Sequence, residues 1–162
     1  MAYSLLNKLV VGVSSRALFD LTKENDIFEQ QGVDAYSKYQ IEHETDVLKP
    51  GPGFSLIRSL LNLNKLPNQK NRVEVIVMSR NSADTSLRVF HSISHYGLEI
   101  SRAALASGGS LAPYLGAFKT DLFLSAYEDD VQSAINSGIA AGIIVSDGIH
   151  IYPFSDEIKQ IR

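Results

Sequence analysis

Several kinds of residue and segment are missing from this sequence, and each absence excludes a class of protein. There is no cysteine among the 162 residues, which excludes a disulfide framework and a thiolate metal site. No apolar segment approaches the length that spans a bilayer, and the apolar run near the N-terminus is typical of a core strand rather than a signal peptide. We therefore expect a soluble protein of the cytoplasm.

An excess of charge of either sign is also missing. The 15 Lys and Arg are scattered, the net charge is −3 and the pI is about 5.8. Duplex nucleic acid and anionic membranes attract basic surfaces, so neither is an expected partner. Hydrophobic residues make up 44% of the chain and charged residues 20%, which is typical of one globular domain, here residues 1–162.

Four short apolar runs predict the strands of a sheet. They lie at 8–14, 73–79, 121–126 and 141–146. The first, second and fourth are nearly continuous in Val and Ile, which favours strands covered on both faces, as in a parallel sheet. Helical patterns lie between the runs, at 53–66, 82–97 and 127–138. We expect an α/β fold, a three-layer α/β/α sandwich with a mainly parallel Rossmann-like sheet.

Two of these helices carry apolar stripes that predict their buried faces. In the first, the stripe consists of Phe54, Ile57, Leu60, Leu61 and Leu63. In the second, which Ser82 begins and Gly97 ends, the predicted buried residues are Leu87, Phe90, Ile93 and Ser94.

Residues 20–49 interrupt the alternation of strands and helices. They are polar and helix-prone, and they precede the sequence Pro-Gly-Pro-Gly at 50–53. A crossover helix does not need so many residues. We predict a small helical cap insert over the carboxyl edge of the sheet, where α/β proteins bind ligands. An ordinary long surface connection is the alternative.

The loops after the strands bring polar groups to one edge of the sheet. A predicted phosphate or nucleotide site consists of Ser14, Ser15, Arg16, Ser79, Arg80, Asn81, Gly108, Gly109 and Ser110. Hydroxyl, amide and guanidinium groups suit an anion, and the Gly-Gly-Ser turn suggests a nest of backbone N–H groups. The alternative is that serines after strands only complete turns and caps.

Familiar catalytic motifs are absent. There is no Walker loop, no dinucleotide fingerprint and no Gly-x-Ser-x-Gly elbow. His91 and His95 lie four residues apart without an evident third metal ligand, and the Glu-His-Glu at 42–44 is interpreted as an exposed polar turn. The acids at 128–130 suit a helix N-terminus, although they are also acidic enough for Mg²⁺. We assign no catalytic residue and no metal ligand.

Longer segments resemble a known family. They are the opening strand and the stretches 36–54, 75–98, 107–126 and 133–144. Together they resemble the cytosolic 5′-nucleotidase I family, magnesium-dependent nucleoside monophosphatases related to haloacid-dehalogenase-type phosphatases. The most distinctive parts are Glu-His-Glu, Pro-Gly-Pro-Gly-Phe and His-Tyr-Gly-Leu. The resemblance implies a HAD-like fold, Mg²⁺ as cofactor and a nucleoside monophosphate as ligand, but it covers only the N-terminal of two related halves.

The catalytic parts that the resemblance implies are largely missing from this half. Val13 would stand where the family has its attacking aspartate, and Ser15 where it has its acid/base. The second motif's hydroxyl survives as Ser79, whereas Leu111 replaces the lysine and Lys119 is a poor substitute. Ser125 and Ala126 replace the magnesium-binding acids. Losing nucleophile, cation and metal ligands removes most of the machinery for phosphoryl transfer.

Three hypotheses follow. The chain is either the noncatalytic N-terminal half of a 5′-nucleotidase, whose Asp-x-Asp strand would begin near the end of this sequence, or a stand-alone nucleotide-binding or regulatory module. A third, weaker hypothesis is a phosphatase that uses the acids at 128–130. If a catalytic second half normally covers one face, that face is apolar and self-association is expected.

Overall fold

A computed structural model of the chain describes residues 4–68 and 71–145, and its centre is a five-stranded parallel sheet. The strands are β1 Leu9–Ser14, β2 Val73–Ser79, β3 Arg102–Leu105, β4 Leu122–Ser125 and β5 Ala140–Ile143. Their order across the sheet is β3-β2-β1-β4-β5, and every pairing is parallel. The predicted α/β class with a Rossmann-like parallel sheet is confirmed.

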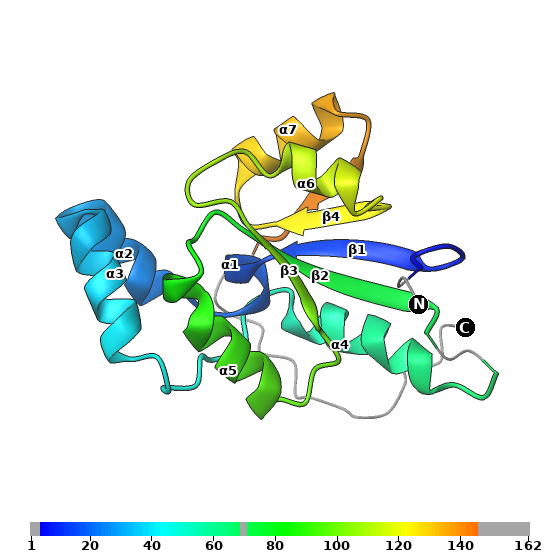
Figure 1. Cartoon of the computed structure of the whole chain (residues 1–162), viewed down its shortest axis with the longest axis horizontal. Coiled ribbons are helices and arrows are strands. Elements are labelled where there is room, and N and C mark those ends of the chain that lie inside the picture. Colours follow the sequence, from blue (N-terminus) through cyan, green and yellow to red (C-terminus); the bar gives the residue numbers. More distant parts are fainter. Residues whose placement is uncertain (1–3, 69–70, 146–162) are drawn as a thin grey trace.

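Helices cover both faces of this sheet (Figure 1). They are α1 Ser15–Leu18, α2 Thr22–Gln31, α3 Val33–Glu42, α4 Phe54–Asn62, α5 Leu87–His95, α6 Ala112–Ala117 and α7 Glu128–Asn136, with 3₁₀ turns η1 Leu63–Lys65 and η2 Asp84–Ser86. The helices α4 and α5 pack on one face and α6 and α7 on the other, which makes the three layers. Among the described helices, none combines the length and apolar composition that a membrane crossing requires.

The alternation of β1 divides the core between the two faces. Val11 and Val13 are fully buried in the cluster that includes α4 and α5, whereas Val10 belongs to the cluster that includes α6 and α7. Gly12 shares the second face, where an added Cβ would lie 3.2–3.3 Å from Phe123, Leu115 and Met78. The central strand is therefore covered on both sides, as its continuous run of apolar residues predicts.

Two strands differ from their predictions. Strand β3 was not among the four strands predicted. Its sequence, Arg-Ala-Ala-Leu, contains no β-branched or aromatic residue that would mark it as a strand. It forms by pairing along β2, from Ile76 opposite Arg102 to Ser79 opposite Leu105. Strand β5 ends at Ile143, before the predicted end at 146, and residue 146 itself lies outside the described residues.

The predicted face of α4 is confirmed, whereas that of α5 is correct at Phe90 and Ile93 and wrong at Leu87 and Ser94. Phe54, Ile57 and Leu61 are buried, and Leu60 and Leu63 pack against the same cluster. In α5, Leu87 is 39% exposed and Ser94 is exposed, whereas Arg88, Val89, Ser92 and Ile93 are buried. The buried polar residues face the segment that returns from α3, a long-range contact that the helix sequence does not encode.

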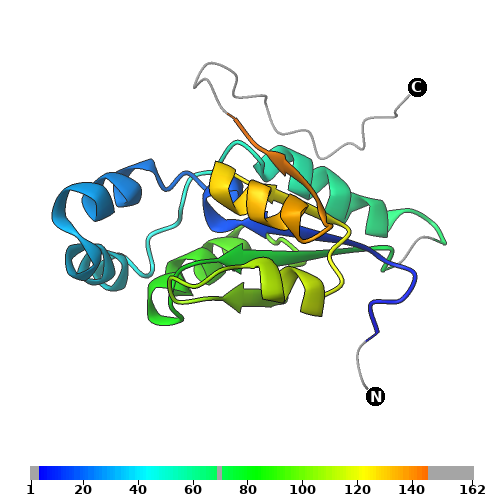
Figure 2. The same cartoon turned by 90° about the horizontal axis from the view of Figure 1, so that it is seen from above.

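The strand order creates a place for a ligand. The chain crosses from β3, at one edge of the sheet, to β4 on the other side of β1, so the connections that follow β1 and β4 leave on opposite faces. Such a switch point opens a crevice at the carboxyl ends of the strands. The helices α2 and α3 lie beyond these ends, set apart from the three layers (Figures 1 and 2).

The segment Pro50–Gly53 brings the chain back from α2 and α3 against β1's exit. The Gly51 N–H donates to the Leu18 carbonyl at 2.9 Å, and the Gly53 N–H donates to the Ala17 carbonyl at 2.7 Å. A Cβ on Gly51 would lie 2.7–2.8 Å from backbone atoms of Phe19. Glycine is therefore required at residue 51 by close backbone approach.

We predict that Gly51→Ala lowers the free energy of unfolding by about 1–3 kcal/mol, the usual cost of overpacking against atoms that cannot move aside. Gly116→Ala is the matched control, because an added Cβ there meets nothing within 4 Å. The control should gain about 0.5–1 kcal/mol from helix propensity. Urea unfolding measures both variants, and an unchanged midpoint for Gly51→Ala would contradict the prediction.

Candidate functional site

A cavity of about 500 Å³ lies at the carboxyl edge of the sheet, between the strand ends and the helices α2 and α3. The end of β1 and the start of α1 contribute Ser14, Ser15 and Arg16, and the end of β2 with its following loop contributes Ser79, Arg80, Asn81 and Ser82. Further lining side chains include Glu24, Asn25, Phe28 and Tyr36 from α2 and α3, and Tyr127, Asp129 and Asp130 after β4. Seven of the nine residues predicted for the phosphate site line this cavity: the three after β1, Ser79, Arg80, Asn81 and Gly108.

Ser14 joins the loops on either side of the switch point. Its Oγ accepts a hydrogen bond from the Ala17 N–H at 3.2 Å and another from the Ala126 N–H at 3.3 Å. A hydroxyl has two acceptor positions and one proton. Both acceptor positions of Ser14 are thus occupied by the protein, and the remaining proton suits an acceptor oxygen placed in the cavity.

The other serines also close turns. Ser79 Oγ accepts from the Asn81 N–H at 3.1 Å and lies 3.3 Å from Ser15 Oγ, while Ser125 Oγ accepts from the Tyr127 N–H at 3.1 Å. All are buried. Turn chemistry, the alternative for these serines, accounts for the N–H groups that Ser79 and Ser125 accept. Ser15 and Ser79 also line the cavity, and one of their two hydroxyl protons is used in the bond between them.

The two cavity arginines have different partners. Arg80 Nη2 forms an ion pair with Asp130 Oδ1, which links the β2 loop to α7 across the end of β1. The Asp130 side chain is 3% exposed and that of Arg80 is 48% exposed. Arg16 instead donates from Nη1 to Asn25 Oδ1 at 3.1 Å, and its guanidinium lies 5.3 Å from the centre of the Tyr127 ring. Both groups that contact the Arg16 guanidinium are therefore uncharged.

The predicted backbone nest at 107–110 is engaged elsewhere. The Gly108 N–H donates to the Arg80 carbonyl at 2.6 Å, and the Gly109 N–H donates to the Ala106 carbonyl at 2.8 Å. Ser110 Oγ accepts from the Ala112 N–H at 3.3 Å, and neither Gly109 nor Ser110 is among the lining residues. This turn braces the β2 loop, and because the N–H groups of Gly108 and Gly109 are bonded within it, an anion nest there stays a prediction without support from these two groups.

The residue of β1 that meets the cavity is Ser14. Val13, which the resemblance aligned with an attacking aspartate, is fully buried in the apolar core and does not line the cavity. Strand alternation turns successive side chains to opposite faces, so a shift of one residue decides which of them reaches the site. Ser14 and Arg16 are two positions apart and both line the cavity. Ser14 offers a hydroxyl there and Arg16 a permanent positive charge.

The sequence predicted a helical cap at 20–49 but no binding residue within it, and the helices α2 and α3 of this segment supply one wall of the cavity. Phe28 and Tyr36 lie edge to face, with ring centres 5.9 Å apart. Burial raises the pKa of the Tyr36 phenol, against hydrogen bonds from Gln40 and Asn81 that lower it, so the phenol stays neutral at physiological pH. The signal that could have found these residues is aromatic side chains in an otherwise polar segment.

The carboxylates at the cavity do not fit a magnesium site. Glu24 and Asp130 each have an arginine partner, and Glu29 and Asp129 are exposed. Within residues 4–68 and 71–145, no three acidic, His or Cys side chains gather as metal ligands. Magnesium prefers several unengaged oxygen ligands. The donor set at this edge therefore does not suit Mg²⁺, and no chemical step is derived through it.

His43 and His91 lie outside the cavity and have structural partners. His43 Nδ1 lies 2.9 Å from the Tyr39 carbonyl and its ring stacks on Tyr39, with centres 4.0 Å apart. His91 Nδ1 lies 3.0 Å from the Glu44 carbonyl. These contacts tie the end of α3 and its following turn to α5.

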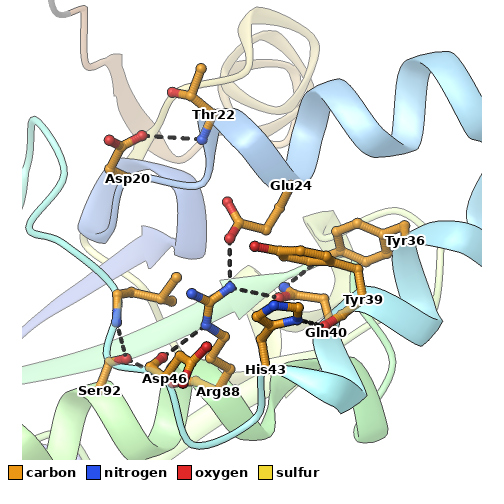
Figure 3. A network of polar contacts seen from close by, with 11 residues as sticks. Asp20, Thr22, Glu24, Tyr36, Tyr39, Gln40, His43, Asp46, Arg88 and Ser92 are labelled. Carbon is orange, nitrogen blue, oxygen red and sulfur yellow. Dashed lines mark hydrogen bonds and ion pairs between the residues drawn. The ribbon is translucent and has the colours of Figure 1, made fainter.

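Arg88 of α5 anchors the α2 and α3 wall to the sandwich (Figure 3). Its Nη1 lies 2.5 Å from Glu24 Oε1 and 3.4 Å from Gln40 Oε1, and its Nε donates to the Asp46 carbonyl at 2.8 Å. Both members of the ion pair are at least nine-tenths buried. One turn later, Ser92 Oγ accepts from the Leu48 N–H at 2.9 Å.

We predict that Arg88→Met costs about 3–5 kcal/mol of stability, because it leaves the Glu24 carboxylate buried without its cation. The double variant Glu24→Met, Arg88→Met removes both charges and should recover most of the loss. Chemical denaturation gives the free energies, and hydrogen exchange should show α2 and α3 opening first in the single variant. Equal losses in the single and double variants would contradict the coupling.

Two comparisons of the sequence show which known proteins this chain is similar to. A sequence model of the family described as 5′-nucleotidase matches residues 1–162. The human protein named cytosolic 5′-nucleotidase 1B is 34% identical over 140 residues, which cover 83% of this chain and 23% of the human protein. The chain thus spans about a quarter of the length of that relative.

Proposed function

This chain belongs to the 5′-nucleotidase family, and on that premise we propose that its cavity binds the phosphate of a nucleoside monophosphate without hydrolysing it. The chain would then be a noncatalytic half, with α2 and α3 as its cap. A second half, carrying the Asp-x-Asp strand and the Mg²⁺ site, would supply hydrolysis. The name of the human relative supports a cytosolic location.

The observation that carries this proposal is the pair of residues at the end of β1. Ser14 and Arg16 line the cavity two positions apart, and neither is a carboxylate. A serine hydroxyl without an adjacent base is a weak nucleophile, and a guanidinium does not release its proton in proteins. Asp130 and Glu24 do reach the cavity, but arginines pair with both.

Binding is supported by the donors that the protein leaves available. Ser14 and Arg16 both line the cavity; the Ser14 hydroxyl accepts two N–H groups and keeps its own proton, and neither Arg16 contact is to a carboxylate. Hydrogen bonds from a guanidinium to phosphate are stronger than bonds between neutral groups. A phosphate bound at the end of β1 would therefore exchange hydrogen bonds to water for one from a charged donor, Arg16, and one from a neutral donor, Ser14.

The stand-alone regulatory module remains the second candidate, and the same site supports it. The two candidates differ in the consequence of nucleotide binding. A half-enzyme would help to shape the pocket of a catalytic partner, whereas nucleotide binding to a regulatory module would change how the module associates. In both, a catalytic second half or a second copy of the chain is the proposed partner.

We predict that the chain releases no phosphate from AMP or IMP above background when Mg²⁺ is supplied. The physical reason is the missing carboxylate nucleophile. A phosphate-release assay at high protein concentration measures this directly. Sustained turnover that disappears in Ser15→Ala or Asp130→Asn would overturn the proposal of a noncatalytic half.

We further predict that Asp130→Asn strengthens phosphate binding about tenfold, because it frees the Arg80 guanidinium for the ligand, and a hydrogen bond to a charged group contributes about 1.5–3 kcal/mol. Asp129→Asn is the matched control, since it removes the same charge from the same helix turn without releasing Arg80. NMR titration with phosphate reports affinity through amides of the β1 and β2 loops. Equal effects of the two variants, or no shifts in these loops at millimolar AMP, would count against the site.

A further inference from the structure

Strand β5 forms one edge of the sheet, and among the described residues no strand pairs with its outer side. Its inner side pairs with β4 in a regular one-to-one register, from Leu122 opposite Ala140 to Ser125 opposite Ile143. An edge strand leaves backbone N–H and C=O groups open, and proteins guard such edges with charged residues, proline or a bulge. Residues 131–146 contain no charge and no proline, so β5 lacks all three guards.

Alternation along β5 shows which of its backbone groups face outward. The Ile144 N–H donates to the Ser125 carbonyl of β4 at 2.8 Å. Successive residues of a strand direct their backbone groups to opposite sides, so those of Ile143 point away from β4, and Val145 follows the same parity. Ile143 is 47% exposed and Val145 is 78% exposed. This edge therefore combines outward backbone groups, for which the described residues supply no partner, with uncovered apolar side chains.

The two faces of β5 differ in what covers them. Ile144 packs against the core cluster that includes α4, whereas Ala141 packs against the cluster that includes α6 and α7. Alternation then places Ile143 and Val145 on the same face as Ala141. A further strand beside β5 would bury them if it carried apolar residues at the matching positions.

The residues that follow Val145 lie outside the described part of the chain, and their sequence has the pattern of such a strand. Residues 146–148 are Ser-Asp-Gly, residues 149–152 are Ile-His-Ile-Tyr, and Pro153 comes next. A three-residue hairpin loop needs a positive φ at its last position, which glycine adopts without strain. Alternating β-branched and aromatic residues favour a strand, and proline, which has no N–H, is typical of the end of an edge strand.

We propose that residues 149–152 form an additional strand on the outer side of β5, antiparallel to it and joined to it by the loop at 146–148. The occupant of the open edge is then a segment of this chain rather than a second copy. Closing a loop of this length costs little entropy, whereas a second copy must also lose translational and rotational freedom. The hairpin makes the sheet six-stranded and closes β5 to self-association.

The register of the hairpin follows from the length of its loop. Three loop residues place Ile151 opposite Ile143, and the next pair toward the loop is Val145 with Ile149. Alternation puts both pairs on the face that α7 covers, where the exposed apolar side chains of β5 lie. A loop one residue shorter would place His150 opposite Ile143 and turn both added isoleucines to the other face.

Hydrogen exchange of the intact chain, followed by NMR, tests whether the edge is covered. We expect the amides of Ile143 and Val145 to exchange at least about tenfold more slowly than exposed amides, because each donates to the added strand. Ile144 is the internal reference, since its N–H is bonded to β4 whether or not the strand forms. Rapid exchange at Ile143 and Val145 beside a protected Ile144 would overturn the proposal.

Two substitutions at Gly148 test the loop. Gly148→Val should abolish the protection of Ile143 and Val145, because a β-branched residue is strained at positive φ. Gly148→Asn is the matched control and should keep the protection, since asparagine tolerates that conformation. Ile144 should stay protected in both variants, which shows that the sandwich remains folded. Protection of Ile143 that survives Gly148→Val would contradict the hairpin.

A last measurement distinguishes the chain's own strand from a second copy. The hairpin brings the Cα atoms of Ile144 and His150, a pair without mutual hydrogen bonds, to about 4.5 Å, so a nuclear Overhauser effect joins their α-protons. This contact and the protection of Ile143 should be unchanged when the protein is diluted. Protection that falls on dilution, without that contact, would assign the edge to a second copy and overturn the proposal.

Discussion

The buried ion pair between Glu24 and Arg88 is the interaction on which the site depends. It joins the first turn of α2 to α5, and so fixes the distance between the wall of α2 and α3 and the ends of the strands. Two charges taken out of water contribute little net stability, but they tolerate few alternative arrangements once buried. Gln40 connects this pair to Tyr36, so the same network that holds the wall also orients one of the cavity's aromatic rings.

At the opposite side of the cavity, the serines that end the strands have two roles at once. Their oxygens accept N–H groups that the parallel sheet leaves unpaired at its carboxyl edge, and this keeps the loops short and rigid. Because the acceptor positions are used internally, the hydroxyl protons are what the loops offer to a ligand. An edge built in this way offers hydrogen-bond donors, and the proposal of phosphate binding rests on them.

The layers and strands could be predicted from sequence because continuous Val and Ile runs are a local signal. The strand β3 and the face of α5 could not, since Ala103 and Ala104 carry no strand preference and the burial of Arg88 and Ser92 depends on segments 40 or more residues away. The site was predicted in part: the polar residues after β1 and β2 were found because parallel strand ends meet at one edge. Its aromatic wall was not, and the choice between Val13 and Ser14 required knowing where β1 ends.

The charges around the cavity decide which donors an anion could use there. Arg80 is already neutralised by Asp130, and Asp129 and Glu29 add negative charge to the lining of the cavity. A phosphate dianion would meet one guanidinium, Arg16, that has no carboxylate partner within the described residues, and it would meet repulsion from the exposed acids. Its binding would therefore depend on Arg16 and on the Ser14 proton more than on Arg80.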